Sequence, residues 1–216
     1  LISSIGLNKK IIINERNDPS KKKISIFWKI LKFLIYRNAD KIFVNLPNVK
    51  KSFIYKNLFF IPNPITILPE KKVKKKKIIL SVARLDYQKN IDLLIKSFSK
   101  SIAIKKNWKL VIFGKGKEKK KLLMLVNKLG ISNFVIFKGT TEKINYWYKK
   151  SEIFTLSSRF EGMPNALIEA MNSKLAVIGT RIPGIKFFIK NKINGLLFEV
   201  NNEKELTKHI NFLIKN

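Results

Sequence analysis

The sequence contains no cysteine, so it can form neither a disulfide bond nor a thiolate metal site. His209 is its only histidine and falls in the last predicted helix, which excludes from this chain a catalytic triad, a histidine metal cluster and a histidine base. Only 14 residues are acidic, and no apolar run reaches the roughly 20 residues that a membrane-spanning helix needs. Thiol chemistry, histidine catalysis and a membrane-spanning segment are therefore not expected.

The formal net charge of +31 suggests a nucleic-acid or an anionic membrane partner. Arginine is the residue that best reads phosphates and guanine, yet it is rare among the 45 basic residues. The arginines are Arg16, Arg37, Arg84, Arg159 and Arg181. The excess of lysine is typical of codon bias in an AT-rich genome, so no nucleic-acid partner is expected. An anionic membrane surface fits better, because each exposed lysine near it contributes about 1 kcal/mol.

The most apolar stretch of the chain, residues 24–36, also carries a polar stripe. Ser25, Lys29 and Lys32 recur at helical spacing, which predicts an amphipathic helix. This helix either packs its apolar face against a sheet or lies in a membrane interface. The chain begins at Leu1 instead of a methionine, so we expect a fragment or a processed product.

From about Lys77 onward, short apolar runs alternate with helical patterns. Continuous apolar strands separated by helices predict a parallel sheet covered on both faces, a doubly wound, Rossmann-like α/β fold. Its ligand crevice should lie outside the carboxyl ends of the strands. The predicted strands are 78–83, 109–113, 134–137, 153–156, 175–179 and 196–200, and the predicted helices lie near 90–105, 118–129, 142–150, 164–173, 184–190 and 203–215.

The first 65 residues look like the end of a separate, partial α/β domain. They contain three predicted strands, 11–13, 41–44 and 58–61, with helices at 24–36 and 47–56. Residues 66–77 are rich in lysine and predict an exposed linker. The second domain then spans residues 78–216.

The stretch EGMPNALIEAM, which begins at Glu161, follows the predicted strand 153–156. Gly162 permits a tight turn and Pro164 suits the first helical position, so a helix should start at 163–165 and end near Ser173. The free N–H groups at such a start attract anions. Glu169 lies two turns in, about 9 Å along the helix, so Glu161 and Glu169 could hold sugar hydroxyls at either end of a diphosphate. By itself, the stretch also fits an ordinary amphipathic helix.

A second phosphate signal follows the strand 78–83. Arg84 and Lys89 come after this strand, and Lys89 falls at the predicted start of a helix. A cation there opposes the helix dipole unless an anion lies nearby. Two cations from one strand end and a helix start from a neighbouring strand could therefore flank one diphosphate.

These motifs resemble, in this order, the nucleotide-sugar-dependent glycosyltransferases of family four, which have the two-domain GT-B fold. The resemblance covers roughly residues 11–215, and its pairing of an Arg-to-Lys motif with a Glu-to-Glu motif is highly specific. The matching segments are Ile61–Ile65, Arg84–Asn90, Gly114–Gly116, Phe137–Gly139, Glu161–Glu169 and Asn194–Leu197.

The resemblance implies a role for each matching residue. Arg84 and Lys89 would bind the donor diphosphate and stabilise the leaving group, the work that a metal ion does in other transferases, so no metal and no cofactor are expected. Glu161 would hold hydroxyls of the transferred sugar, and Glu169 would bind the ribose. Backbone groups would contact the sugar and phosphate at Gly162, Met163, Pro164 and Asn165, and border the base at Lys138 and Gly139.

The implied reaction moves a hexose or N-acetylhexosamine, with retention of configuration, from a nucleotide sugar to a lipid-linked or cell-surface glycan. A UDP-sugar is the expected donor, in the synthesis of a bacterial polysaccharide or lipopolysaccharide. The expected location is the cytoplasm, including the inner face of the plasma membrane. The alternative is a truncated module that binds a nucleotide sugar without transferring it. A basic nucleic-acid-binding protein would need arginine or aromatic clusters, which the sequence does not show.

The sequence also departs from the family pattern. Where the family commonly has Gly-Gly-Ile-Pro-Glu, this chain has Pro183–Phe187, without the acid, and Lys115 stands where an acid is frequent. The family's N-terminal domain is more than twice as long as residues 1–65 and holds a glycine-rich loop and a histidine, so we expect activity to require such a region. The segment Glu15–Pro19 either lines the cleft or forms a simple turn.

Overall fold

The computed structural model describes residues 10–15, 25–45, 57–64 and 73–216. The chain divides into two compact units. The first comprises Leu1–Pro64 and Glu161–Met163, and the second comprises Ile65–Phe160 and Pro164–Asn216. The predicted helix at 47–56, residues 16–19 of the predicted cleft segment and residues 66–72 of the predicted linker lie outside the described residues.

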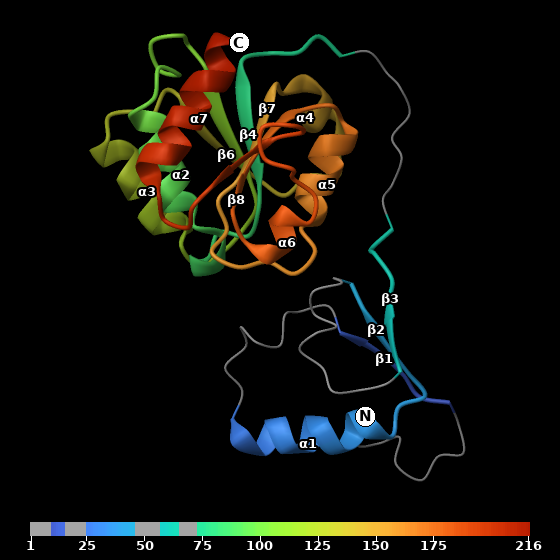
Figure 1. Cartoon of the computed structure of the whole chain (residues 1–216). Coiled ribbons are helices and arrows are strands. Elements are labelled where there is room, and N and C mark those ends of the chain that lie inside the picture. Colours follow the sequence, from blue (N-terminus) through green and yellow to red (C-terminus); the bar gives the residue numbers. More distant parts are fainter. Residues whose placement is uncertain (1–9, 16–24, 46–56, 65–72) are drawn as a thin grey trace. The chain divides into compact units, whose positions relative to one another are not determined.

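The second unit is built on a six-stranded parallel sheet, shown in Figure 1. Its order, β6-β5-β4-β7-β8-β9, starts in the middle and winds first to one side and then to the other. This is the doubly wound order, so the predicted fold class is confirmed. The strands are β4 (Ile78–Val82), β5 (Lys109–Phe113), β6 (Val135–Gly139), β7 (Ile153–Leu156), β8 (Ala176–Thr180) and β9 (Leu196–Phe198).

Helices cover both faces of this sheet, as the continuous apolar strands require (Figure 1). In β4, the buried Ile79 packs in one core, whereas Ile78 and Leu80 pack in the other. The first core includes buried residues of α2 (Ile91–Ser99), α3 (Lys119–Lys128) and α7 (Glu203–Lys215). The second includes those of α4 (Ile144–Lys150), α5 (Asn165–Asn172) and α6 (Pro183–Lys186).

Three predicted helices differ in their ends, and the one predicted over 184–190 spans only Pro183–Lys186. The helix predicted over 90–105 stops at Ser99, where the Ser101 hydroxyl donates to the Phe98 carbonyl at 2.7 Å and competes with the helical pattern. The start of α5 lies within the predicted range, but Pro164 is not its first helical residue. With ψ at 83° it precedes the helix, and its carbonyl accepts the first helical hydrogen bond, from Leu167.

The first unit contains a three-stranded parallel sheet and one helix. The sheet has the order β1 (Ile12–Glu15), β2 (Lys41–Val44), β3 (Leu58–Phe60), and α1 spans Ile26–Arg37. Glu15 accepts hydrogen bonds from Lys32 and from the Tyr36 hydroxyl, so the end of β1 is joined to α1. Glu15 is the one residue of the predicted cleft segment that the structure describes, and it is bonded to this helix.

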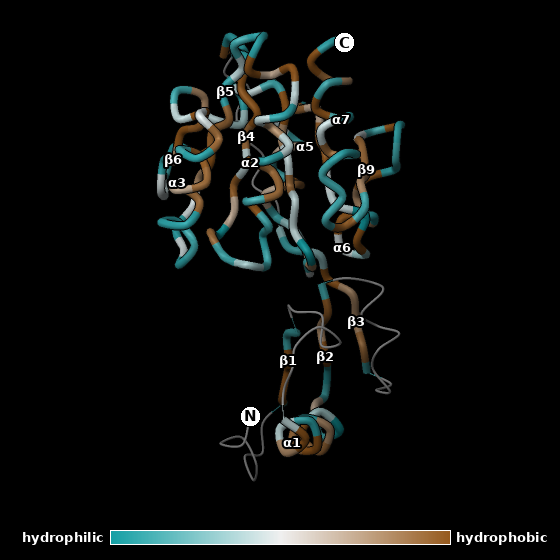
Figure 2. Tube along the Cα trace, turned by 90° about the vertical axis from the view of Figure 1, so that its left-hand side faces the viewer, coloured by the Kyte–Doolittle hydropathy of each residue, from teal (hydrophilic) through white to brown (hydrophobic). Residues whose placement is uncertain are grey.

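The apolar face of α1 is exposed to solvent. Figure 2 shows hydrophobic residues along this helix, and Tyr36 is the one residue in it that is buried. Among the described residues, burial against a sheet therefore does not account for this face. No helix in the part of the chain that the structure describes is both long and apolar enough to cross a membrane. The large apolar residues that α1 exposes are Ile26, Phe27, Trp28, Ile30, Phe33 and Leu34.

Candidate functional site

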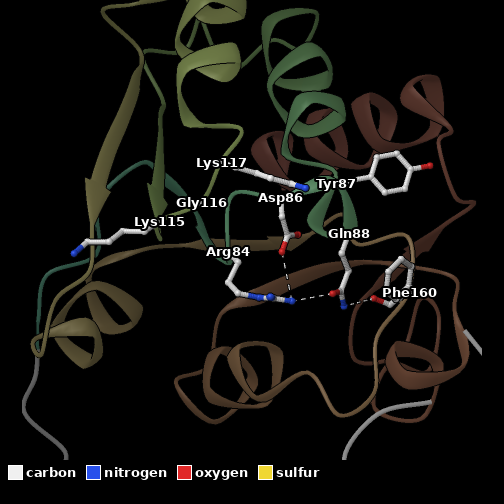
Figure 3. Close-up of a pocket in the computed structure, with 8 residues that line it drawn as sticks. All are labelled: Arg84, Asp86, Tyr87, Gln88, Lys115, Gly116, Lys117 and Phe160. Carbon is white, nitrogen blue, oxygen red and sulfur yellow. Dashed lines mark hydrogen bonds and ion pairs between the residues drawn. The ribbon is translucent and has the colours of Figure 1, made fainter. Parts of the chain in front are cut away.

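The candidate site lies where the winding of the second sheet reverses, at the carboxyl ends of β4 and β7. The last pair between these two neighbouring strands is Leu80 with Phe154, although β4 stays paired with β5 up to Val82 and β7 with β8 up to Leu156. A pocket of about 560 Å³ opens there, between the loops after β4, β5 and β7 (Figure 3). It is the crevice that a doubly wound fold offers to ligands. Its lining residues are Arg84, Asp86, Tyr87, Gln88, Lys115, Gly116, Lys117 and Phe160.

Arg84 enters this pocket from the loop after β4. Its guanidinium donates to the side-chain oxygen of Gln88 at 2.9 Å and lies 3.4 Å from the Asp86 carboxylate (Figure 3). The Arg84 side chain is 69% exposed, and an ion pair in that setting contributes little free energy. An anionic ligand can therefore replace Asp86 as the partner of this guanidinium at small cost.

Lys89 ends a one-turn 3₁₀ helix, Tyr87–Lys89, which we call the cationic turn. Asp86 caps this turn, because its carboxylate accepts from the Lys89 N–H at 3.2 Å. Asn90 follows in the left-handed conformation, with φ at 53°, and separates Lys89 from α2. Lys89 thus lies two residues before the first residue of α2, close to the predicted helix start, but in a separate turn that precedes the helix.

The loop after β5 presses against the loop after β4. The Leu85 N–H donates to the Lys115 carbonyl at 2.9 Å. A Cβ built on Gly114, whose φ is +141°, would lie 1.8 Å from the Ala83 carbonyl oxygen, and one on Gly116 would lie 2.2 Å from the Leu85 oxygen. The Gly-Lys-Gly motif is therefore needed for this close approach of two backbones, whereas the Lys115 side chain points away from Arg84 (Figure 3).

The segment after β7 closes the pocket on the other side. The Ser157 hydroxyl contacts the carbonyls of Lys89 and Asn90 at 2.9 and 3.0 Å. The Gln88 amide donates to the Phe160 carbonyl at 2.9 Å (Figure 3). These bonds join the cationic turn to the residues that lead into EGMPNALIEAM.

The residues predicted from that motif fall in both units. Glu161, Gly162 and Met163 follow Phe160 directly in the chain and belong to the first unit, whereas Pro164, Asn165 and Glu169 belong to the second. Asn165 is the exposed first residue of α5, and Glu169 lies one turn further along the same helix, partly buried.

Tyr148 is a neighbour of Glu169 that the sequence did not predict. It lies on α4 and is fully buried. Burial first, and the Glu169 carboxylate second, raise the pKa of its phenol well above its usual range. Tyr148 therefore stays protonated and presents a hydrogen-bond donor beside Glu169. No local pattern could have revealed this pair, because the two residues lie on different helices.

Lys138 and Gly139 are the last two residues of β6, as the predicted strand end implied. The Gly139 carbonyl accepts from the Gly114 N–H at 2.6 Å, and Gly139 has a φ of +69°. The Lys138 ammonium lies 5.6 Å from the ring centre of Trp147, within the range of a cation–π contact. The ends of β5 and β6 are thus joined next to the pocket.

The part of the chain that the structure describes contains no group of three or more histidine, aspartate and glutamate side chains that could hold a metal ion.

The family described as "Glycosyl transferases group 1" matches residues 66–216, which include the pocket and both motifs. The chain belongs to this family. A relative from Haemophilus influenzae, an "uncharacterized glycosyltransferase", is 36% identical over 223 residues, covering 100% of this chain and 63% of the relative. A Campylobacter jejuni relative is 32% identical and covers 97% of this chain and 62% of its own length; it is named as an N-acetylgalactosaminyltransferase acting on a diphospho-undecaprenol-linked saccharide. This chain thus spans about three-fifths of either relative.

Two solved structures share this architecture. Anabaena HepE in complex with UDP aligns over 99% of this chain and 65% of its own, with a TM-score of 0.88 and 18% identity. Staphylococcus aureus TarM, solved with UDP, aligns over 97% and 45%, with a TM-score of 0.86 and 23% identity. These likenesses confirm the predicted GT-B-type α/β fold. Placement in family four stays a prediction.

Proposed function

We propose that this protein is a glycosyltransferase that moves a hexose or N-acetylhexosamine from a nucleotide sugar to a lipid-linked or cell-surface glycan, with retention of configuration. The observation that carries the proposal is the pocket at the switch point, where Arg84 and the cationic turn lie beside the segment leading to α5. The name of the Campylobacter jejuni relative supports a lipid-linked glycan acceptor, and the two UDP complexes support a UDP-sugar donor.

In this proposal, protein cations do the work of a metal ion. Arg84 exchanges its solvent-exposed contact with Asp86 for the donor diphosphate, and Lys89 contacts the same group. Departure of the nucleoside diphosphate builds negative charge, which preorganised cations stabilise. Glu161 holds hydroxyls of the transferred sugar, and the backbone from Gly162 to Asn165 contacts sugar and phosphate. Lys138 and Gly139 border the base.

A donor screen tests the proposal. UDP-, GDP- and ADP-linked hexoses and N-acetylhexosamines are each incubated with the protein and a lipid-diphosphate-linked saccharide, with and without EDTA. Mass spectrometry detects the added sugar, and the anomeric coupling constant in the product reports retention or inversion. Binding without transfer by every donor would favour the binding-module alternative, and an inverted product would contradict retention.

Glu169 is expected to bind the donor ribose, with Tyr148 as its buried neighbour. Glu169→Ala removes one or two hydrogen bonds to a charged acceptor, which cost about 1.5–3 kcal/mol of binding free energy. Calorimetric titration with UDP, GDP and ADP should show this loss, and a circular dichroism spectrum should show that the variant still folds, because Glu169 itself is only partly buried. Unchanged affinity for all three nucleotides would remove the ribose assignment.

We also propose that the protein works at an anionic membrane surface on the cytoplasmic side. The apolar face of α1 is exposed, and Lys29 and Arg37 on the same helix are exposed as well. A helix with aromatic and basic residues of this kind can lie in the headgroup region. The diphospho-undecaprenol in the name of the Campylobacter jejuni relative fits such a surface.

Vesicle sedimentation measures this association. The protein should bind phosphatidylglycerol vesicles and be released as salt rises through physiological strength, since the charges are screened. Phe27→Ser with Ile30→Ser should weaken binding, whereas Met124→Ser, which alters an exposed apolar residue of α3, should not. Equal binding to neutral and anionic vesicles, or binding to neither, would contradict the proposal.

A further inference from the structure

The cationic turn and the segment after β7 lie beyond the last residues that pair their two strands. Pairing between β4 and β7 ends at Leu80 and Phe154, before either segment begins. Bonds between the two segments themselves therefore help to align them. Arg84 precedes the turn and Lys89 is its last residue, so the same bonds help to position these two cations.

Arg159 makes the most extensive of these contacts. Its backbone N–H donates to the Gln88 carbonyl at 2.8 Å, and its Nη1 donates to the Tyr87 carbonyl. Its guanidinium lies 4.1 Å from the centre of the Tyr87 ring, a cation–π distance. Its Nη2 lies 3.9 Å from a carboxylate oxygen of Asp92, in the first turn of α2. The Arg159 side chain thus contacts the backbone of the turn, the Tyr87 ring in the turn, and the first turn of the helix that follows.

The side chain of Arg159 is placed to act through other residues. It is 19% exposed, and it is not one of the eight residues that line the pocket. Gln88, which follows Tyr87 in the turn and whose carbonyl accepts from the Arg159 backbone N–H, uses its own amide group to bridge the Phe160 carbonyl and the Arg84 guanidinium. A displacement of the turn would therefore move Arg84 through Gln88, and would move Lys89 directly.

We propose that Arg159 is a positioning residue that locks the cationic turn, so that Arg84 and Lys89 are preorganised for the diphosphate of the donor. The inference rests on the proposed function, since it presumes a nucleoside diphosphate in the pocket. Preorganised charges act strongly because they need no rearrangement when the ligand's charge develops. Arginine suits the position because a planar guanidinium stacks and donates in several directions at once, which an ammonium cannot do.

The test compares how the protein binds a nucleoside diphosphate and the matching monophosphate. Calorimetry first selects whichever of UDP, GDP and ADP binds the wild-type chain best, and competition titration gives the Kd of its monophosphate. The Kd of the monophosphate divided by the Kd of the diphosphate isolates the contribution of the second phosphate. A general loss of folded structure would weaken the binding of both nucleotides equally and leave that ratio unchanged.

Arg159→Ala and Arg159→Lys are both expected to lower this ratio by about tenfold, a loss equivalent to about 1.4 kcal/mol. Lysine keeps the charge, so its failure to restore the ratio separates positioning from simple attraction. Arg181→Ala is the matched control, because Arg181 is also paired with an acid, Glu199, and carries the same charge without touching the turn. It should leave the ratio within about twofold of wild type, well below the tenfold loss.

The outcomes distinguish the inference from the function on which it rests. A wild-type chain that binds no nucleoside diphosphate would overturn both. Wild-type binding with an unchanged ratio in the Arg159 variants, or full restoration by lysine, would overturn the inference alone. If Arg159→Ala does not fold, Arg159→Lys, which retains the alkyl stem and the charge, decides the question by the same ratio.

Discussion

Replacing either Arg84 or Lys89 by alanine is expected to lower the kcat of sugar transfer by about 10²–10³-fold, or roughly 3–4 kcal/mol. The loss should fall on kcat more than on the KM for the donor, because the diphosphate carries more charge in the transition state than in the bound donor. Steady-state transfer assays with wild type and both variants measure it. Wild-type turnover in both variants would overturn the proposed catalytic role.

Three controls sharpen this prediction. Lys115→Ala removes an equal charge from the same pocket, but its side chain points away from Arg84 (Figure 3), so its effect should be much smaller. Lys89→Arg should not restore full activity, since a planar fork differs from a compact ammonium. EDTA should leave wild-type turnover unchanged, and abolition of activity by EDTA would show that a metal ion does the work assigned here to cations.

Gly114→Ala is expected to destabilise the second unit by about 3 kcal/mol or more. The added Cβ would lie 1.8 Å from the Ala83 carbonyl oxygen, and the φ of +141° is one that alanine rarely adopts. Neither the oxygen, which belongs to a strand-end backbone, nor the glycine can move without disturbing the contact between the loops after β4 and β5. Urea unfolding followed by circular dichroism measures the change in unfolding free energy.

Gly130→Ala is the matched control for that collision. Gly130 also has a positive φ, +66°, but a Cβ there would meet nothing within 4 Å. Its loss should therefore be limited to the cost of the left-handed conformation, about 1–2 kcal/mol. Equal losses in the two variants would show that the close approach of the two loops is not needed for stability.

Much of the fold could be predicted because burial leaves a local mark in the sequence. Strands buried on both faces are continuously apolar, so the ends of each of the six strands of the second unit were predicted to within two residues. The alternation of these strands with helices then requires a parallel sheet, and the carboxyl ends of its strands locate the crevice. Arg84 could be placed at this edge for the same reason, because it lies two residues after β4, and α5 starts within the predicted range of 163–165.

What only the tertiary structure decided are contacts between segments far apart in the chain. The bond between the Gln88 amide and the Phe160 carbonyl, the contacts of Arg159 with the cationic turn and the place of Tyr148 beside Glu169 have no periodic signature. The sequence also did not decide whether the apolar face of α1 is buried or exposed, because periodicity predicts an apolar face but not what covers it. Periodicity reports how deeply a residue is buried relative to its neighbours in sequence. Which side chains contact one another across a site depends on strand order and loop packing, and these depend on the whole chain.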